Sequence, residues 1–464
     1  MNAIIALSLF GIVNLFIGLQ NKRKLLLPAA LLFLVAAMVI NVLDWNQHFL
    51  YFNGMLRVNN QFINFSTIIL LSALLVVAIS RGFGTDEEHT HPAEYYSIMM
   101  FSAVGAMMMV GYENIIMLFV GLEILSVSMY VLTGTDKRSL RSNEAALKYF
   151  LMGSFATGIF LFGVALIYGA TGTFNVANIG NYVQANRMAI SPFLYVGIIM
   201  MLIGMLFKVS AAPFHFWTPD VYDGAPTIFT AYMSTIVKTA GFAAIAKLLY
   251  ISFSGLYGFW WNTVVVITIL TLLIGNLTAV YQLSFKRMLA YSSISHAGYM
   301  LISLVALSSA SQSSILFYSL AYTVATITAF AVLILVSESK QKDGRPDESI
   351  DALNGLAKKS PLLAFALTVS MLSLAGIPLT AGFWGKFFVF SNAIDRRMTF
   401  ILIYAVLMSA VGIYYYFKPI IAAYMKEGDE QTIEIKPLMR FTIIVMVVIT
   451  IVLGFMPDLA KSLF

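Results

Sequence analysis

The sequence predicts an all-α polytopic membrane protein that crosses the bilayer about 14 times. Hydrophobic residues make up 60% of the 464 residues and charged residues only 11%, whereas a soluble domain is roughly 25% charged. The apolar residues form runs of about 20, the length of a membrane-spanning helix, rather than the alternating ten-residue strands of an outer-membrane barrel. Proline and glycine interrupt two of these runs, which indicates discontinuous helices.

The expected spans occupy almost the whole chain, which is therefore one membrane domain. They lie at 2–20, 25–43, 63–80, 96–111, 114–133, 145–169, 192–217, 226–250, 260–281, 286–306, 313–336, 361–394, 399–418 and 440–457. The seventh span contains Pro213. The twelfth is long for one straight helix and contains Gly376, Pro378 and Gly382. A broken helix in each half of the chain is typical of transporters that are built from repeats.

The distribution of lysine and arginine predicts the orientation in the membrane. If the N-terminus lies outside, eighteen of the 28 fall in inside loops, five in outside segments and the remaining five within spans. Cytoplasmic loops carry the excess of positive charge. An even number of spans then places both termini on the outer side.

The composition excludes several kinds of site. There is no cysteine, so the chain offers no thiolate-ligated iron–sulfur cluster, disulfide or catalytic thiol. The net charge of +6 is scattered through short loops, and we expect no nucleic-acid partner. No glycine-rich phosphate loop, metal-ligand cluster or nucleophile–base motif is present. The chain is therefore expected to hold no cofactor and to perform no bond chemistry alone.

Glu123 and Lys208 are charged residues deep within expected spans. Glu123 lies about 15 Å along the fifth span, and Lys208 lies beside the break at Pro213. A charge at this depth costs roughly 2.5–3.5 kcal/mol on insertion scales, so the two are expected to pair. The proton affinity of the lysine then depends on how close the carboxylate is. The alternative is an ion pair that only fixes helix packing.

Four further lysines fall within spans. Lys238 lies about 18 Å beyond Pro226 and so near mid-membrane, while Lys247 faces the opposite side of that helix and is expected to extend toward the interface. Lys386 follows the break in the twelfth span. Lys148 lies near the inner end of the sixth span, where an ordinary interfacial lysine is an equally good interpretation. Lys238 and Lys386 are the stronger candidates for a polar path.

Two histidines, His215 and His296, lie within spans or at their breaks. They could ligate a haem, relay protons or be hydrogen-bonded core residues. Proton relay is favoured over haem because histidine titrates near neutrality and no second cofactor feature accompanies the pair.

The segment SAAPFHFWTPDVYDGAP, with Lys208 before it and Lys238 after it, resembles the signature of the antiporter-like proton-pumping subunits of respiratory complex I. The sequence PDVYDGAP is most similar to that of the N branch of this family, and the lysine at position 386 also resembles that branch. The resemblance covers essentially all the expected spans. One departure is Ile228, where relatives often have proline.

The resemblance implies a fold of two inverted five-helix repeats. On that basis, N-terminal helices occupy 1–95, repeat one 96–250, repeat two 260–418 and a last helix 440–457. By the same resemblance, protons move along Glu123, Lys148, Lys208, His215, Lys238, His296 and Lys386. Glu123 and Lys208 match the paired residues of spans five and seven, and Lys386 faces an outer half-channel.

The resemblance further implies a proton-translocating subunit of NADH:quinone oxidoreductase, driven by quinone reduction elsewhere in the complex. Flavin, iron–sulfur clusters and quinone would lie on other subunits. The partners would be other membrane subunits, including antiporter-like ones, and lipids of a bacterial inner membrane. Two alternatives stay open, namely a subunit of a multisubunit cation/proton antiporter and a membrane scaffold.

Overall fold

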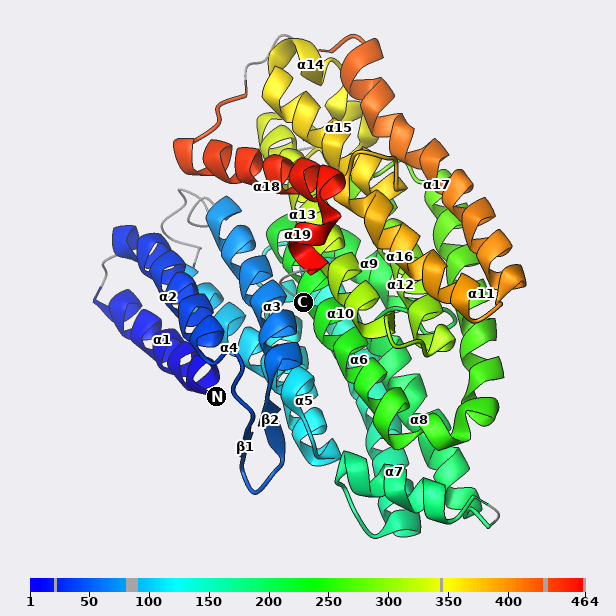
Figure 1. Ribbon diagram of the computed structural model, residues 1–464. Helices are drawn as coiled ribbons and strands as arrows, with labels where there is room; N and C mark the ends of the chain where they lie inside the picture. Colours follow the sequence, from blue (N-terminus) through cyan, green and yellow to red (C-terminus); the bar gives the residue numbers. More distant parts are fainter. Residues whose placement is uncertain (21–22, 81–90, 188, 343–344, 429–432, 462–464) are drawn as a thin grey trace.

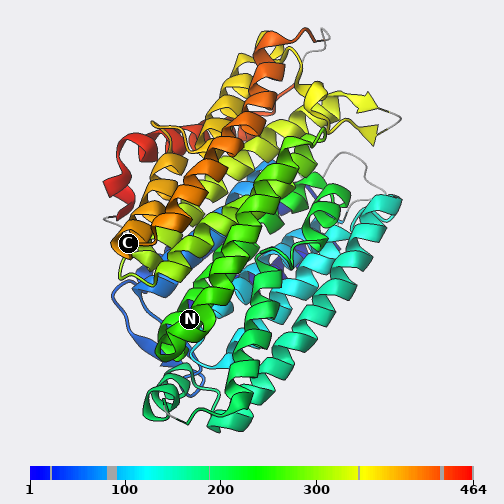
Figure 2. The same ribbon diagram turned by 90° about the vertical axis from the view of Figure 1, so that its right-hand side faces the viewer.

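The computed structural model describes residues 1–20, 23–80, 91–187, 189–342, 345–428 and 433–461. These residues form a bundle of long helices, as the sequence predicts (Figures 1 and 2). Lys22 and Arg81, two of the charges that set the expected orientation, lie outside the described residues.

Twelve helices within the described ranges are long and apolar enough to cross a membrane. They are α1 (Asn2–Leu19), α2 (Arg23–Leu43), α3 (Asn60–Ile79), α4 (Pro92–Gly111), α5 (Ile115–Thr133), α6 (Leu140–Thr171), α10 (Thr227–Lys247), α11 (Tyr257–Val280), α12 (Phe285–Ala306), α13 (Ser311–Ser339), α17 (Thr399–Met425) and α18 (Pro437–Phe455). A π-helical turn, Leu248–Ser252, extends α10. In Figure 1, α18 lies across its neighbours rather than along them.

The two expected discontinuous spans are broken in the structure. The first consists of α8 (Pro192–Lys208) and α9 (Trp217–Gly224), and the second of α15 (Pro361–Ala375) and α16 (Ala381–Asp395). Together with the twelve long helices, they are consistent with the expected number of spans.

The first break begins earlier than expected. The helix α8 ends at Lys208 rather than at Pro213, and Ser210 adopts the left-handed region with φ of 64°. The residue before a proline is kept out of the helical region, so the helix has to end upstream of it. The Trp217 indole nitrogen, at the start of α9, donates at 3.0 Å to the Phe207 carbonyl, which also accepts from the Ser210 amide at 3.1 Å.

The second break depends on two glycines. Gly376 ends α15 with φ of 82°, and the amide of Ile377 donates to the Leu372 carbonyl at 2.9 Å. Gly382, in the first turn of α16, packs directly on Ser373: a Cβ at Gly382 would lie 1.8 Å from the Ser373 carbonyl oxygen. Glycine at this position lets the two half-helices approach each other.

Small elements cover the two ends of the bundle, and the fold is all-α as expected. At one end lie α7 (Val176–Ala185) and an antiparallel hairpin of β1 (Phe49–Tyr51) and β2 (Leu56–Val58) (Figure 1). At the other end lie β3 (Gln341–Lys342), β4 (Arg345–Pro346), a short 3₁₀ turn (Ile350–Leu353) and α14 (Leu356–Lys359) (Figure 2). After α18 comes α19 (Pro457–Lys461). Residues 52–54 in the turn of the first hairpin have positive φ. The sequence prediction considered membrane spans and did not include this hairpin.

The centre of the bundle is made by α10, α12 and α13. The apolar window of α10 is 100% buried and those of α12 and α13 are 94% buried, against 28% for α1, α2 and α17. A helix buried on all sides occupies the core of a large protein. Lys238 and His296 lie on α10 and α12 and are therefore far from lipid.

Replacing Gly382 by alanine is expected to destabilise the protein by about 1–3 kcal/mol, because the new methyl group overlaps the Ser373 carbonyl. Thermal unfolding of the detergent-solubilised protein measures the change. Gly158→Ala in α6 is the matched control, since a Cβ there meets no atom within 4 Å. Equal unfolding temperatures for the two variants would contradict the close contact.

Candidate functional site

Five of the seven predicted site residues are buried in the bundle. Lys208, His215, Lys238, His296 and Lys386 are at most 5% exposed. The other two, Glu123 and Lys148, are only partly buried.

Lys208 is the last residue of α8 and lies in a pocket of neutral partners. Its ammonium group donates to the Ser126 hydroxyl on α5 at 2.5 Å. It also lies 5.5 Å from the ring centre of Tyr130 and 5.4 Å from that of Tyr149, distances at which an aromatic face attracts a cation. The Tyr149 ring stacks on Trp217 of α9 at 4.5 Å, so this pocket joins both sides of the first break.

Glu123, the expected partner of Lys208, is not in contact with it. The Glu123 carboxylate accepts a hydrogen bond from Thr157 on α6 at 3.0 Å. Ser126, which binds the lysine, lies one turn further along α5, so the two charges are within electrostatic range of each other. The structure therefore shows the two charges separated, each held by a hydroxyl group.

His215 lies inside the first break, between α8 and α9. Its ring packs on Phe216, and its buried Nδ1 atom has no hydrogen-bond partner in the described part of the chain. Close by in the sequence, Thr218 donates to Ser210 at 2.7 Å. A buried ring nitrogen without a protein partner is a typical position for a bound water molecule.

Lys238, on α10, binds to α12 and α13. Its ammonium group donates to the Ser293 carbonyl and lies 5.5 Å from the ring centre of Tyr322. The Tyr322 hydroxyl in turn donates to the Ser293 side chain at 3.0 Å. The lysine is thus joined to the helix that carries His296.

His296 uses both ring nitrogens. Its Nδ1 atom is 2.6 Å from the Tyr318 hydroxyl, and its Nε2 atom is 3.0 Å from the Tyr416 hydroxyl. A neutral imidazole accepts at one nitrogen and donates at the other, so the ring connects two hydroxyl groups from α13 and α17. The Tyr416 hydroxyl continues to Ser292 by a further short hydrogen bond.

Lys386, on α16, reaches back across the second break. Its ammonium group donates to the Ala375 carbonyl at 2.7 Å and to the Ser409 hydroxyl on α17 at 2.9 Å. It also lies 4.7 Å from the ring centre of Tyr299, which is on α12 with His296. Both Lys238 and Lys386 are close enough to act electrostatically on His296.

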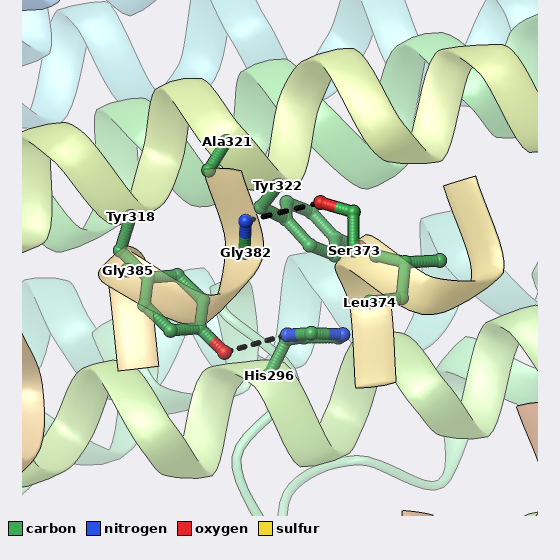
Figure 3. A pocket seen from close by; sticks show the side chains of 8 residues that line it. All are labelled: His296, Tyr318, Ala321, Tyr322, Ser373, Leu374, Gly382 and Gly385. Atoms are coloured by element: carbon green, nitrogen blue, oxygen red, sulfur yellow. Dashed lines mark hydrogen bonds between the residues drawn. The ribbon is translucent and has the colours of Figure 1, made fainter. Parts of the chain in front are cut away.

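A small cavity lies between His296 and the second break (Figure 3). Its walls are His296 and Leu374, with Tyr318, Ala321 and Tyr322 from α13 and Ser373, Gly382 and Gly385 around the break. Its volume of about 10 Å³ is close to what one water molecule needs. A single water there would border both the histidine and the polar groups of the break.

Lys148 lies apart from the buried lysines, in a charged cluster near the start of α6. It forms ion pairs with Glu144 at 2.7 Å and with Asp220 at 3.0 Å, and its side chain is 41% exposed. Asp220 also pairs with Arg287 at 3.2 Å. The structure therefore places Lys148 at the surface and not with the buried lysines.

Lys247 does not extend to the interface as the sequence predicts. It is buried and pairs with Glu113 at 3.0 Å, and Glu113 pairs with Arg57 of β2 at 2.9 Å. The prediction was wrong because Glu113 lies in the short link between α4 and α5, and nothing in the sequence shows that the link folds against the end of α10. The amide of Glu113 also donates to the Met55 carbonyl at 2.8 Å, which fixes the link to the hairpin.

Sequence reasoning also missed the buried tyrosines. Tyr299, Tyr318, Tyr322 and Tyr416 surround His296 with ring-centre distances of 4.9 to 6.5 Å. Their spacing in α12 and α13 is a usable signal, since Tyr299 follows His296 by three residues and Tyr318 and Tyr322 share one helix face. The position of Tyr416 beside His296 can be seen only in the tertiary structure.

Comparison with known proteins identifies relatives of the whole chain. A family model described as NADH:quinone oxidoreductase/Mrp antiporter, TM, matches residues 113–412. NADH-quinone oxidoreductase subunit N of Trichlorobacter lovleyi is 44% identical over 431 residues, which cover 92% of this chain and 87% of the relative. The same subunit of Flavobacterium psychrophilum is 40% identical over 464 residues and covers 100% of both chains.

Solved structures show the same fold. A chain of respiratory complex I from Thermus thermophilus has a TM-score of 0.83 and 33% identity, and covers 98% of each chain. A chain of the Mrp complex from Dietzia has a TM-score of 0.86, covers 100% of this chain and 96% of that one, and is 20% identical. At that identity the second likeness shows the fold alone.

Replacing Glu113 by alanine is expected to destabilise the protein by about 3–5 kcal/mol, because Lys247 is left as an uncompensated buried charge. The double variant Glu113→Ala/Lys247→Met should recover most of this loss. Arg57→Ala should cost less than about 1 kcal/mol, since the Arg57 side chain is 48% exposed. Thermal unfolding of the solubilised protein compares the three, and equal effects of Glu113→Ala and Arg57→Ala would contradict the pairing.

Proposed function

The chain belongs to the subunit N family of NADH-quinone oxidoreductase, and on that premise we propose that it moves protons through the membrane as a non-redox subunit of this enzyme. Quinone reduction elsewhere in the complex would supply the energy. The observation that carries the proposal is the buried series Lys238–His296–Lys386 in the centre of the bundle. Ionisable groups inside a membrane domain usually mark ion or proton paths, since they are costly to bury.

The first part of the proposed path is a switch between Glu123 and Lys208. In this structure the lysine donates to Ser126 and the carboxylate accepts from Thr157, so neither charge neutralises the other directly. Rotation of the lysine toward Glu123 would favour its charged form, and return to the aromatic pocket would make proton release easier. Lys208 lies at the break, where the Trp217 indole at the start of α9 binds the Phe207 carbonyl at the end of α8.

The second part of the path runs along α12. Lys238 contacts Ser293 and Tyr322, while His296 lies between the Tyr318 and Tyr416 hydroxyls. Histidine can take a proton at one ring nitrogen and give up another from the second, so it can pass a proton between two sides without turning over. Lys386, when it is a neutral amine, receives the proton at Nζ and becomes an ammonium group next to Ser409 and the Ala375 carbonyl.

His215 is proposed to serve this path through water bound at its free Nδ1 atom. Lys148, in the surface cluster with Asp220 and Arg287, is proposed to act where protons enter from the inner side. Both termini are proposed to lie on the outer face of a bacterial inner membrane. The redox groups of the enzyme, namely flavin, iron–sulfur clusters and quinone, are proposed to lie on other subunits, and the partners are other membrane subunits of the complex.

Replacing Lys208 or Lys386 by methionine is expected to reduce the number of protons pumped per electron, because methionine fills a similar volume but carries no proton. The variants are compared in intact complex reconstituted into vesicles, with quinone reduction and vesicle acidification recorded together. Lys426→Gln is the control: Lys426 forms an exposed pair with Asp351 and should have no effect. Normal pumping by both methionine variants would support a scaffold instead.

A cation/proton antiporter is the second candidate, because the family model and the fold are shared with Mrp proteins. Purification from native membranes in mild detergent separates the two. The complex I proposal requires that the chain co-purifies with flavin, iron–sulfur signals and quinone reduction. Isolation with small hydrophobic partners and cation-driven proton flux, without redox centres, would favour the antiporter.

A further inference from the structure

The last long helix, α18, crosses the second break. It lies across its neighbours in Figure 1, and it packs on α13 and on both α15 and α16, the two halves of the broken helix. It also contacts α3, one of the N-terminal helices. A single helix therefore touches both sides of the break and can hold them in one arrangement.

The closest approach is at Gly454, in the last turn of α18. A Cβ at this position would lie 2.3 Å from the Leu379 carbonyl oxygen and 2.6 Å from the Thr380 nitrogen, so glycine lets α18 lie directly on the backbone that links the two halves. Leu379 has φ of 71°, a left-handed conformation that is uncommon for a residue with a side chain. Such a conformation persists where the surrounding structure holds it in place.

Trp384 fastens α18 to the first turn of α16. Its indole nitrogen donates to the Gly454 carbonyl at 2.8 Å. Carbonyl groups in the last turn of a helix lack amide partners within that helix, so a side-chain donor can satisfy one of them. Next to Gly454, Leu453 packs with Ala381 and Phe317. The end of α18 is thus bound both to the link and to α16.

Lys386 lies on the opposite face of α16. It follows Trp384 by two residues, which is about 200° around the helix. Its stem lies against Gly376, where an added Cβ would be 2.6 Å from the Lys386 Cδ atom, and its ammonium group reaches the Ala375 carbonyl at 2.7 Å. Both of these residues precede the link, at the end of α15. The surroundings of the ammonium group therefore depend on how the two halves of the break are held together.

The two halves also meet directly. The Gly382 amide donates to the Ser373 hydroxyl at 3.1 Å (Figure 3). This contact fixes one point near the start of α16. The bond from Trp384 to Gly454, two residues further along, adds a second point and so restricts a tilt of α16 about the first.

We propose that Trp384 and Gly454 are positioning residues for proton transfer at Lys386, through which α18 holds the two halves of the second break together. The inference rests on the proposed function, because it assumes that Lys386 carries a proton. Neither residue touches the proton. They act by keeping the ammonium group beside the Ala375 carbonyl and the Ser409 hydroxyl, the neutral partners that compensate its charge.

Replacing Trp384 by phenylalanine is the first test, made in the intact complex in sealed vesicles. The change removes the indole donor and keeps an aromatic ring against α18. The number of protons pumped per electron should fall toward that of Lys386→Met, since a displacement of about 1 Å at a reacting group can cost roughly a hundredfold in rate. Trp260→Phe is the matched control, because the Trp260 indole donates to the Phe253 carbonyl at 2.9 Å, the same kind of bond away from the break.

Replacing Gly454 by alanine is the second test. The new methyl group would overlap the Leu379 carbonyl and push α18 away from the link, so pumping per electron should fall as it does in Trp384→Phe. Gly180→Ala, on α7, is the control, because a Cβ there would lie 2.5 Å from the Ile251 carbonyl oxygen, a similar overlap far from Lys386 in the sequence. It should lower the unfolding temperature by a similar amount and leave pumping per electron unchanged. If Gly454→Ala does not assemble, Trp384→Phe decides.

The outcomes separate the positioning role from the proposed function. Lower pumping per electron in Trp384→Phe, with unchanged pumping in Trp260→Phe at a similar unfolding temperature, supports the positioning role. If Lys386→Met reduces pumping while Trp384→Phe pumps normally, or if Trp260→Phe reduces pumping equally, the positioning role is overturned and the proposed function stands. Unchanged pumping in Lys386→Met overturns both.

Discussion

The cost of placing a charge inside a membrane domain is the constraint on which this structure depends. Lys208, Lys238 and Lys386 are all buried, and in the described part of the chain each is held by hydroxyl groups, carbonyl oxygens or aromatic faces and not by a carboxylate. Lys247, by contrast, is fixed by Glu113. These neutral partners compensate the charge without forming an ion pair, which under the proposed function leaves the first three lysines able to exchange a proton.

This constraint also explains the arrangement of the helices. The helices α10, α12 and α13, which carry Lys238, His296 and their partner Tyr322, are the most deeply buried, while α1, α2 and α17 are the least buried of the long helices. A proton path has to be shielded from bulk water and lipid and has to contain polar groups. The helices α10, α12 and α13 meet both requirements. The tyrosines around His296 supply hydroxyl groups there without adding charge, at a smaller cost of burial than further ionisable residues would have.

Much of this could be predicted from the sequence, because membrane spans and their breaks have strong local signals. The apolar runs, the Pro213 break and the Gly376–Gly382 break correspond to helices and gaps in the structure, and the deep positions of Lys208, Lys238 and Lys386 followed from counting residues along them. The contacts of Lys247 and the position of Tyr416 beside His296 could not be predicted, since both depend on segments that are distant in sequence. The separation of Glu123 from Lys208 likewise depends on rotamers and on hydroxyl groups of neighbouring helices.

The two broken helices place their lysines in the same kind of electric field, although the lysines occupy different positions relative to the prolines. Lys208 is the final residue of α8, and the ammonium group of Lys386 binds the Ala375 carbonyl at the end of α15. Each cation thus lies at the negative end of a half-helix dipole, which stabilises it by about 0.3–2 kcal/mol. Straightening either break would pair those carbonyls within a continuous helix and remove the field. Helix geometry and lysine charge are therefore coupled, so a bend in the backbone can act on a proton without touching it.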